Sequence, residues 1–218
     1  MSFFAMNDST MAGGNLTVGT YLDEATVASN PFDQFRRWYD DACHTKLEGV
    51  EAVALATATP DGIPSLRMVL LKEFSEHGFV FYTNYESRKA RELEMNPRAA
   101  MLFYWKELKR QLRIEGAVKR VSGEESQRYF ATRERDSQIG AWASKQSTVL
   151  SNRNLLEQEF QKWKQKFQGR DVPCPSHWGG YRLFPHTFEF WQEREHRLHD
   201  RLRYSKNGDH WFCERLAP

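Results

Sequence analysis

Residues 50–84, VEAVALATATPDGIPSLRMVLLKEFSEHGFVFYTN, decide the fold. Three β-rich stretches, 50–59, 63–74 and 79–84, follow one another with only turns between them. In the first turn, Pro60-Asp61-Gly62, proline presets φ and glycine accepts a positive φ. The second turn contains His77-Gly78. Consecutive strands without intervening helices predict antiparallel pairing.

The flanking sequence adds helices around this sheet. Asn30-Pro31 is typical of an N-cap followed by proline at the first helical position, so a helix is expected from there to a point before Gly49. Further helices are expected at 87–95, 124–132, 137–144 and 152–167, and further strands at 99–105, 110–121, 181–191, 197–204 and 210–215. The pattern favours a mainly β fold with peripheral helices (α+β), an antiparallel barrel, over a doubly wound parallel sheet.

The chain length suits one large domain or two small ones, since 218 residues suffice to bury a core. Residues 1–28 carry Gly13, Gly14 and Asn15 among Ser and Thr and sustain no apolar period, so a flexible N-terminal arm is expected there. Residues 29–218 are expected to form a single domain.

Composition excludes several classes of protein. A formal net charge of +2, from 31 basic and 29 acidic residues, argues against a general nucleic-acid binder. Cys43, Cys174 and Cys213 lack metal-ligand spacing and suit a reducing compartment, so no metal site is expected. We find no signal peptide, no apolar run of membrane-spanning length and no GxGxxG, P-loop or HExxH motif. A cytoplasmic protein without a membrane or nucleic-acid partner is expected.

Cations gather at two places in the first half of the chain. With Ser87 as N-cap, Arg88 and Lys89 lie in the first helical turn, where the helix dipole disfavours each cation by about 0.3–1 kcal/mol. Either a bound phosphate or exposure to water would explain them. Arg67 and Lys72 differ in strand parity, so a bulge lies between them, they meet different ligands, or they are simply the polar ends of the strand.

A third group lies in the expected helices after residue 124. Tyr129 lies one helical turn before Arg133, so the two share a face, and Ser137 follows. Tyrosine, arginine and a serine hydroxyl together are typical of a phosphate site. The alternative is that Arg133 pairs with Glu134 or Asp136 on an exposed surface.

A fourth group lies in the stretch 197–203, RLHDRLR. As a strand, this stretch places four cationic or titratable side chains on one face: Arg197, His199, Arg201 and Arg203. Leu198 and Leu202 would then face the core. Arginine rather than lysine favours planar anion recognition over a solvated sheet edge. Without a catalytic triad or metal motif, the chemistry would belong to a bound phosphorylated cofactor.

These groups lie in motifs that resemble the pyridoxine/pyridoxamine 5′-phosphate oxidase family. The resemblance runs from about Pro31 to the end of the chain, and its main motifs in order are RMVLLK at 67–72, FYTN at 81–84, ESRK at 86–89, RQLR at 110–113, RDSQIGAW at 135–142, SKQS at 144–147, WGG at 178–180, EFWQ at 189–192 and RLHDR at 197–201.

The resemblance implies a split β-barrel homodimer with two FMN sites at the subunit interface. The residues that match FMN contacts, some supplied by the partner chain, are Arg67, Met68, Val69, Leu70, Tyr82, Thr83, Arg88, Lys89, Gln111, Gln146, Ser147, Trp191 and Arg201. The residues that match the substrate-phosphate site are Lys72, Tyr129, Arg133 and Ser137. Arg197 and His199 match catalytic residues over the pyridine ring of the substrate.

The implied reaction oxidises pyridoxamine 5′-phosphate or pyridoxine 5′-phosphate to pyridoxal 5′-phosphate. Hydride passes from the C4′ carbon to the flavin, and oxygen is the final acceptor and yields hydrogen peroxide. The alternatives are a related FMN oxidase that acts on another aromatic substrate, such as a phenazine precursor, and a binding protein that carries FMN or pyridoxal phosphate without turnover.

The chain departs from the family pattern at three places that bear on the site. Ala131-Thr132-Arg133-Glu134 stands where the family has His-Ser-Arg-Pro, so Arg133 is kept while its neighbours differ. Gly14-Asn15-Leu16-Thr17 stands where the family often has an Arg-Arg-x-Tyr stretch over the substrate. Glu193-Arg194 follows Trp191-Gln192, where the family has glycine after Trp-Gln. The last two departures are expected to alter contacts near the active site.

Overall fold

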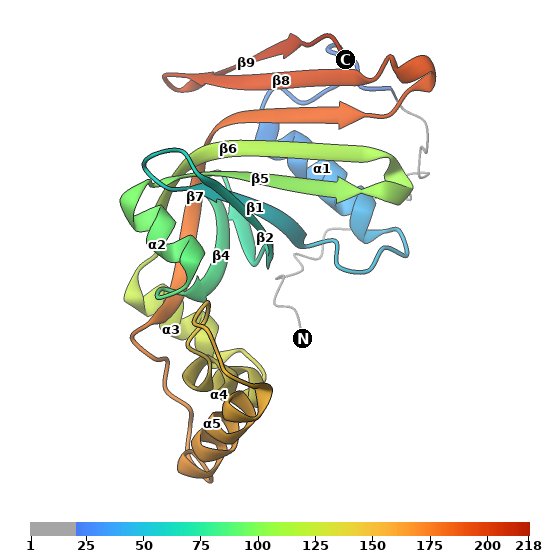
Figure 1. Ribbon diagram of the computed structural model, residues 1–218. Helices are drawn as coiled ribbons and strands as arrows, with labels where there is room; N and C mark the ends of the chain where they lie inside the picture. Colours follow the sequence, from blue (N-terminus) through green and yellow to red (C-terminus); the bar gives the residue numbers. More distant parts are fainter. Residues whose placement is uncertain (1–20) are drawn as a thin grey trace.

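The computed structural model describes residues 21–218, and its nine strands in that range form one antiparallel sheet (Figure 1). The order β2-β1-β5-β6-β7-β4-β3 is extended by β8 on β7 and β9 on β8. The strands are β1 (Ala52–Ala58), β2 (Pro64–Leu70), β3 (Glu73–Ser75), β4 (Gly78–Asn84), β5 (Arg98–Trp105), β6 (Arg110–Arg120), β7 (Trp178–Gln192), β8 (Asp200–Asn207) and β9 (His210–Arg215). The antiparallel, mainly β prediction is confirmed.

The β1–β2 hairpin forms as its turn residues predict. The Thr59 amide donates to the Ile63 carbonyl at 3.1 Å, and Gly62 adopts φ 87°. Alternation along β2 then places Leu66, Met68 and Leu70 on an exposed face and turns Arg67 toward the interior. The hairpin therefore presents an apolar face to the outside and a cation to the inside.

β7 connects the two halves of the sheet. Its first part pairs with β4, its whole length after Gly180 pairs with β6, and its last residues pair with β8. The β6–β7 register shifts between Glu115 and Gly116. A Cβ at Gly116 would lie 2.2 Å from the Phe184 carbonyl oxygen, so only glycine fits at this irregularity.

The helices are α1 (Pro31–Cys43), α2 (Arg88–Met95), α3 (Gly123–Ala131), α4 (Arg135–Ala143) and α5 (Arg153–Lys166), with 3₁₀ turns η1 (Lys106–Leu108) and η2 (Glu195–Arg197). α1 begins as predicted, because the Asn30 side chain accepts from the Phe32 amide at 2.9 Å. It packs Phe35 into the main core against Phe79 and Phe103, with ring centroids 5.0 and 5.5 Å apart.

α3, α4 and α5 gather at one end of the molecule, away from β8 and β9 (Figure 1). They enclose a second, smaller core that contains Phe130, Ile139 and Trp178. No helix within residues 21–218 is both long and apolar enough to cross a membrane.

Two predicted strands differ from the structure. The expected strand 63–74 is broken, since β2 ends at Leu70 and β3 begins at Glu73. The expected strand 197–204 begins only at Asp200, because His196 and Arg197 have φ 56° and 61°, which no strand allows. The prediction that Leu198 faces the core is therefore wrong: 67% of its surface is exposed, whereas Leu202 is fully buried.

Part of the expected N-terminal arm is docked on the domain. Leu22 and Ala28 are buried, and Arg215 of β9 donates to the Leu22 carbonyl at 2.9 Å. The Tyr204 hydroxyl donates to the Ala28 carbonyl at 2.7 Å. Residues 21–28 thus differ from the loose segment expected for them, while residues 1–20, including the departure at 14–17, lie outside the described residues. The boundary at residue 28 stays a prediction.

Candidate active site

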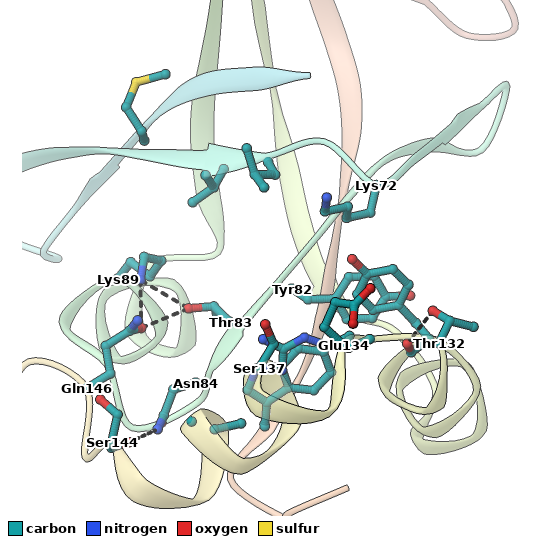
Figure 2. A pocket seen from close by; sticks show the side chains of 18 residues that line it. Lys72, Tyr82, Thr83, Asn84, Lys89, Thr132, Glu134, Ser137, Ser144 and Gln146 are labelled. Carbon is teal, nitrogen blue, oxygen red and sulfur yellow. Dashed lines mark hydrogen bonds between the residues drawn. The ribbon is translucent and has the colours of Figure 1, made fainter. Parts of the chain in front are cut away.

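A cavity of about 680 Å³ lies between strands β2 and β4 on one side and helices α3 and α4 on the other. This volume is typical of a small-molecule site. The sequence-predicted residues that line it are Met68, Val69, Leu70, Lys72, Tyr82, Thr83, Lys89, Tyr129, Arg133, Ser137 and Gln146. These residues come from β2, the β2–β3 turn, β4, the start of α2, the α3–α4 segment and the loop after α4. Figure 2 shows Lys89 with Gln146 on one side of the cavity and Lys72 on another.

Lys89 forms one cationic end of the cavity. Only 8% of its surface is exposed, and its Nζ lies 3.0 Å from both Thr83 Oγ1 and Gln146 Oε1 (Figure 2). Burial, with repulsion from Arg67, lowers the pKa of Lys89 to about 8. Neither partner carries a charge, so an anion would supply what this buried ammonium lacks.

Arg67 and Arg88 lie beside Lys89 and are held by Glu92. Arg88 Nε donates to Glu92 Oε1 at 2.8 Å, and Arg67 Nη2 lies 3.4 Å from Glu92 Oε2. Ser65 and Thr57 also donate to this carboxylate. Burial raises the pKa of Glu92, but these hydrogen bonds outweigh it and lower the pKa to about 2. One carboxylate thus orients two arginines and leaves the cluster cationic.

The loop after α4 closes on the same helix start. Ser87 caps α2 by accepting from the Ala90 amide, as predicted. Ser147, at φ 70°, accepts from the Arg88 amide at 3.2 Å. Gln146 and Ser147 therefore contact Lys89 and Arg88 of the same chain. A helix start flanked by cations is suited to phosphate.

Arg133 marks the other cationic end of the cavity. Its Nη1 atom is buried and has no hydrogen-bond partner among the described residues. Its guanidinium carbon lies 4.7 Å from the Trp178 ring centroid, and burial lowers its pKa despite the nearby Tyr129. Lys72 and Ser137 line the cavity alongside it. The alternative, in which Arg133 pairs with a surface carboxylate, is not supported within residues 21–218. Asp136 pairs with Lys164 instead, and Arg133 Nη1 has no partner there.

An aromatic stack supports this second end. The Tyr82 and Tyr129 rings lie 3.9 Å apart at 15°, and the Tyr82 and Trp178 rings lie 5.3 Å apart at 10°. Trp178 therefore does more than fill the small core, because it also lies under Arg133. The stack packs strand β4 against helix α3.

The remaining predicted residues lie elsewhere in the chain. Gln111, Trp191 and Arg201 are register neighbours across β6, β7 and β8. The His199 ring lies 4.6 Å from that of Trp191. Arg201 donates to Glu189 at 2.8 Å. β8 lies at the end of the molecule away from α3 and α4 (Figure 1), so this group and Arg197 do not border the cavity of the same chain.

The expected column of four cations on one strand face is wrong. Arg197 and His199 precede β8, and only Arg201 and Arg203 belong to it. Carboxylates on neighbouring strands pair with both arginines: Arg201 with Glu189 and Arg203 with Glu214, each at 2.8 Å.

Sequence reasoning missed Glu92, with Thr57 and Ser65. The i, i+4 spacing of Arg88 and Glu92 on one helix was the available signal. Thr57 and Ser65 gave no local signal, because they meet Glu92 only through the β1–β2 pairing.

Solved structures of other proteins share the fold described above. The chain resembles the structure of PhzG from Burkholderia lata in complex with tetrahydrophenazine-1-carboxylic acid, with a TM-score of 0.85 and 34% identity over 89% of this chain and 95% of that one. A pyridoxamine 5′-phosphate oxidase-related, FMN binding protein from Nostoc punctiforme matches with a TM-score of 0.67 at 18% identity, over 84% of this chain and 97% of that one. The fold is the FMN-binding split barrel, as the sequence predicted.

Family models and curated relatives identify the family within this fold. The model "Pyridoxamine 5′-phosphate oxidase" matches residues 39–167, and "Pyridoxine 5′-phosphate oxidase C-terminal dimerisation region" matches residues 178–218. The pyridoxine/pyridoxamine 5′-phosphate oxidase of Rubrobacter xylanophilus is 56% identical to this chain, over 90% of this chain and 91% of its own length. That of Trichormus variabilis is 52% identical, over 90% of this chain and 92% of its own length. The chain belongs to the pyridoxamine 5′-phosphate oxidase family, a family of oxidases.

Proposed function

We propose that this protein is a homodimeric, FMN-dependent oxidase that converts pyridoxamine 5′-phosphate and pyridoxine 5′-phosphate to pyridoxal 5′-phosphate. Oxygen accepts the electrons and leaves as hydrogen peroxide, and the amine substrate also consumes water and releases ammonia. The names of relatives more than 50% identical to this chain support the proposal.

One observation carries the proposal: a single cavity has two separate cationic ends. Lys89, with Arg67 and Arg88 behind it, forms the first, and Arg133 with Lys72 forms the second. Two phosphorylated molecules, the cofactor and the substrate, would require two such ends. The unpartnered Nη1 of Arg133 and the buried, uncompensated charge of Lys89 each lack an anion.

The residues at the first end fit the phosphate of FMN. Arg67, Arg88 and Lys89 would hold it, with Thr83, Gln146 and Ser147 close by, and Met68, Val69, Leu70 and Tyr82 would line the space beside the flavin. FMN, when bound, supplies the two-electron acceptor for the hydride that leaves the C4′ carbon. This chain supplies orientation and charge.

The residues at the second end would hold the substrate. Lys72, Tyr129, Arg133 and Ser137 would bind its phosphate and so position the C4′ carbon. Gln111, Trp191, Arg201, Arg197 and His199 would reach the cavity from the partner subunit. Their strands belong mainly to the segment that matches the dimerisation model, and within one chain they do not border the cavity. Arg197 and His199 would then lie over the substrate ring.

The substrate-phosphate end is tested by removing its buried cation. We expect Arg133→Ala to raise the KM for pyridoxamine 5′-phosphate about 10–100-fold, because a charge-assisted hydrogen bond is worth roughly 1.5–3 kcal/mol. The dissociation constant of FMN, measured by flavin fluorescence, should stay within about twofold. Arg153→Ala, an exposed arginine on α5, serves as control. Loss of flavin with an unchanged KM would contradict this assignment.

A second candidate is a phenazine-type oxidase, favoured by the likeness to PhzG. Its substrate carries a carboxylate and no phosphate, so the pair of cations at the second end, Lys72 and Arg133, favours the doubly charged phosphate of the vitamin B6 substrates over it. An oxidation of tetrahydrophenazine-1-carboxylic acid that Arg133→Ala leaves unchanged would reverse this preference.

A further inference from the structure

The loop between β7 and β8 has a backbone that needs support. His196 and Arg197 both lie in the left-handed region, at φ 56° and 61°, and neither is glycine. Such conformations cost free energy and persist only where neighbouring groups hold them. The same loop carries Arg197 and His199, so its support bears directly on the proposed reaction.

Arg194 is the residue that provides this support. Its Nε lies 3.2 Å from Asp200 Oδ2, at the start of β8. Its guanidinium carbon lies 3.2 Å from the centroid of the Tyr21 ring, in the N-terminal segment. An arginine stacked on a ring and paired with a carboxylate has little freedom left, so its own backbone is held in place.

The backbone amide of Arg194 in turn determines which ring nitrogen of His199 carries the proton. The Arg194 amide lies 3.1 Å from His199 Nδ1. An amide N–H can only donate, so Nδ1 must accept, and the neutral imidazole carries its proton on Nε2. With the ring packed beside Trp191, this leaves Nε2–H as the group that His199 presents as a donor.

The two partners of Arg194 are themselves anchored. Asp200 is buried, and its Oδ1 accepts from Arg215 at 2.8 Å. Arg215 also donates to the Leu22 carbonyl at 2.9 Å and pairs with Glu24 at 2.5 Å. Residues 21–24 are therefore attached to the β7–β8 loop through two arginines that share one aspartate.

We propose that Arg194 is a positioning residue: stacked on Tyr21 and paired with Asp200, it holds the β7–β8 loop so that His199 presents Nε2–H and Arg197 keeps its orientation. The assignment rests on the proposed function of Arg197 and His199.

The first arm of the test measures turnover. In the FMN-loaded protein, Arg194→Ala should lower kcat for pyridoxamine 5′-phosphate at least tenfold and leave the dissociation constant of FMN within twofold. Arg194→Lys keeps the charge opposite Asp200 but loses the planar stack, so it should restore only part of kcat. Tyr21→Phe should match the unsubstituted protein, whereas Tyr21→Ala should resemble Arg194→Ala. Arg153→Ala on α5 is the matched control.

The second arm does not depend on turnover. Nitrogen-15 NMR of histidine-labelled protein should show His199 with Nε2 protonated and Nδ1 as acceptor, and Arg194→Ala and Tyr21→Ala should broaden or shift these signals. Wild-type kcat in Arg194→Ala, or His199 signals unchanged in both variants, would overturn the proposal. Failure of the unsubstituted protein to oxidise either substrate would refute the proposed function instead, and the NMR arm would still decide the positioning role. Tyr21→Ala, which removes only an exposed ring, keeps the test valid if Arg194→Ala fails to fold.

Discussion

At the scale of single residues, the site is a set of cations that the protein does not neutralise. Lys89 is buried against two uncharged oxygens, and Arg133 keeps a buried Nη1 without a partner. Glu92 is the exception, since it orients Arg67 and Arg88 without cancelling the whole cluster. Buried cations without counter-charges destabilise a fold, so their presence is best explained by anionic ligands.

The pKa of Lys89 leads to a prediction about proton uptake. Its value of about 8 lies below the ordinary 10.5, so the charged form is disfavoured while the site lacks an anion. A phosphate beside Nζ restores the charged form and raises the pKa again. Binding of FMN at a pH between about 8 and 10 should therefore take up protons, measured by titration calorimetry in buffers of different ionisation enthalpy.

Two controls separate this effect from other titrations. Riboflavin, which lacks the phosphate, should bind without the uptake, and Lys89→Gln should abolish the uptake with FMN. Proton uptake that persists in Lys89→Gln would show that another group is responsible.

At the scale of elements, most of the sheet could be predicted from local patterns. The turn residues Pro60-Asp61-Gly62 place their hairpin correctly, and Asn30 and Ser87 cap their helices as expected. The β7–β8 loop could not be predicted this way, because alternation in RLHDRLR is compatible with a strand. Its actual course depends on Asp200 and Tyr21, which hold Arg194 from other segments.

The irregularity in the β6–β7 pair gives a stability prediction. A methyl group at Gly116 would meet a backbone oxygen that cannot turn away, so Gly116→Ala should lower the free energy of unfolding by about 1–3 kcal/mol. Gly123→Ala at the start of α3 has open space around it and should be neutral or slightly stabilising. Urea denaturation followed by fluorescence measures both. Equal effects of the two substitutions would contradict the packing argument.

At the scale of the whole molecule, the proposed ligand-binding residues of one chain lie in two separate regions. The cavity is lined by β2, β4 and the α3–α4 segment, whereas Trp191, His199 and Arg201 belong to β7, the β7–β8 loop and β8. β8 lies at the opposite end of the molecule from α3 and α4 (Figure 1). The outer face of β2 exposes Leu66, Met68 and Leu70, of which 68%, 62% and 45% of the surface is exposed. A second copy would both cover this apolar face and complete the cavity.

The proposed dimer is tested on this face. Leu66 lies outside the residues proposed to bind ligands, and Leu66→Glu should weaken self-association by roughly 30-fold or more, because burying an unpaired carboxylate costs at least about 2 kcal/mol. Sedimentation velocity should then show monomers, and FMN affinity should fall with them. Met95→Glu, on an exposed residue of α2, is the control. Monomers that retain full FMN affinity would contradict a site shared between subunits.

The most direct measurement is product formation by the purified, FMN-loaded protein. Pyridoxamine 5′-phosphate, pyridoxine 5′-phosphate, their dephosphorylated forms and tetrahydrophenazine-1-carboxylic acid would be offered separately, with hydrogen peroxide and pyridoxal 5′-phosphate both measured. The two cationic ends of the cavity predict turnover of the phosphorylated vitamin B6 substrates that is lost when the phosphate is removed. Turnover of the phenazine compound alone, or of dephosphorylated and phosphorylated forms equally, would contradict the proposed function.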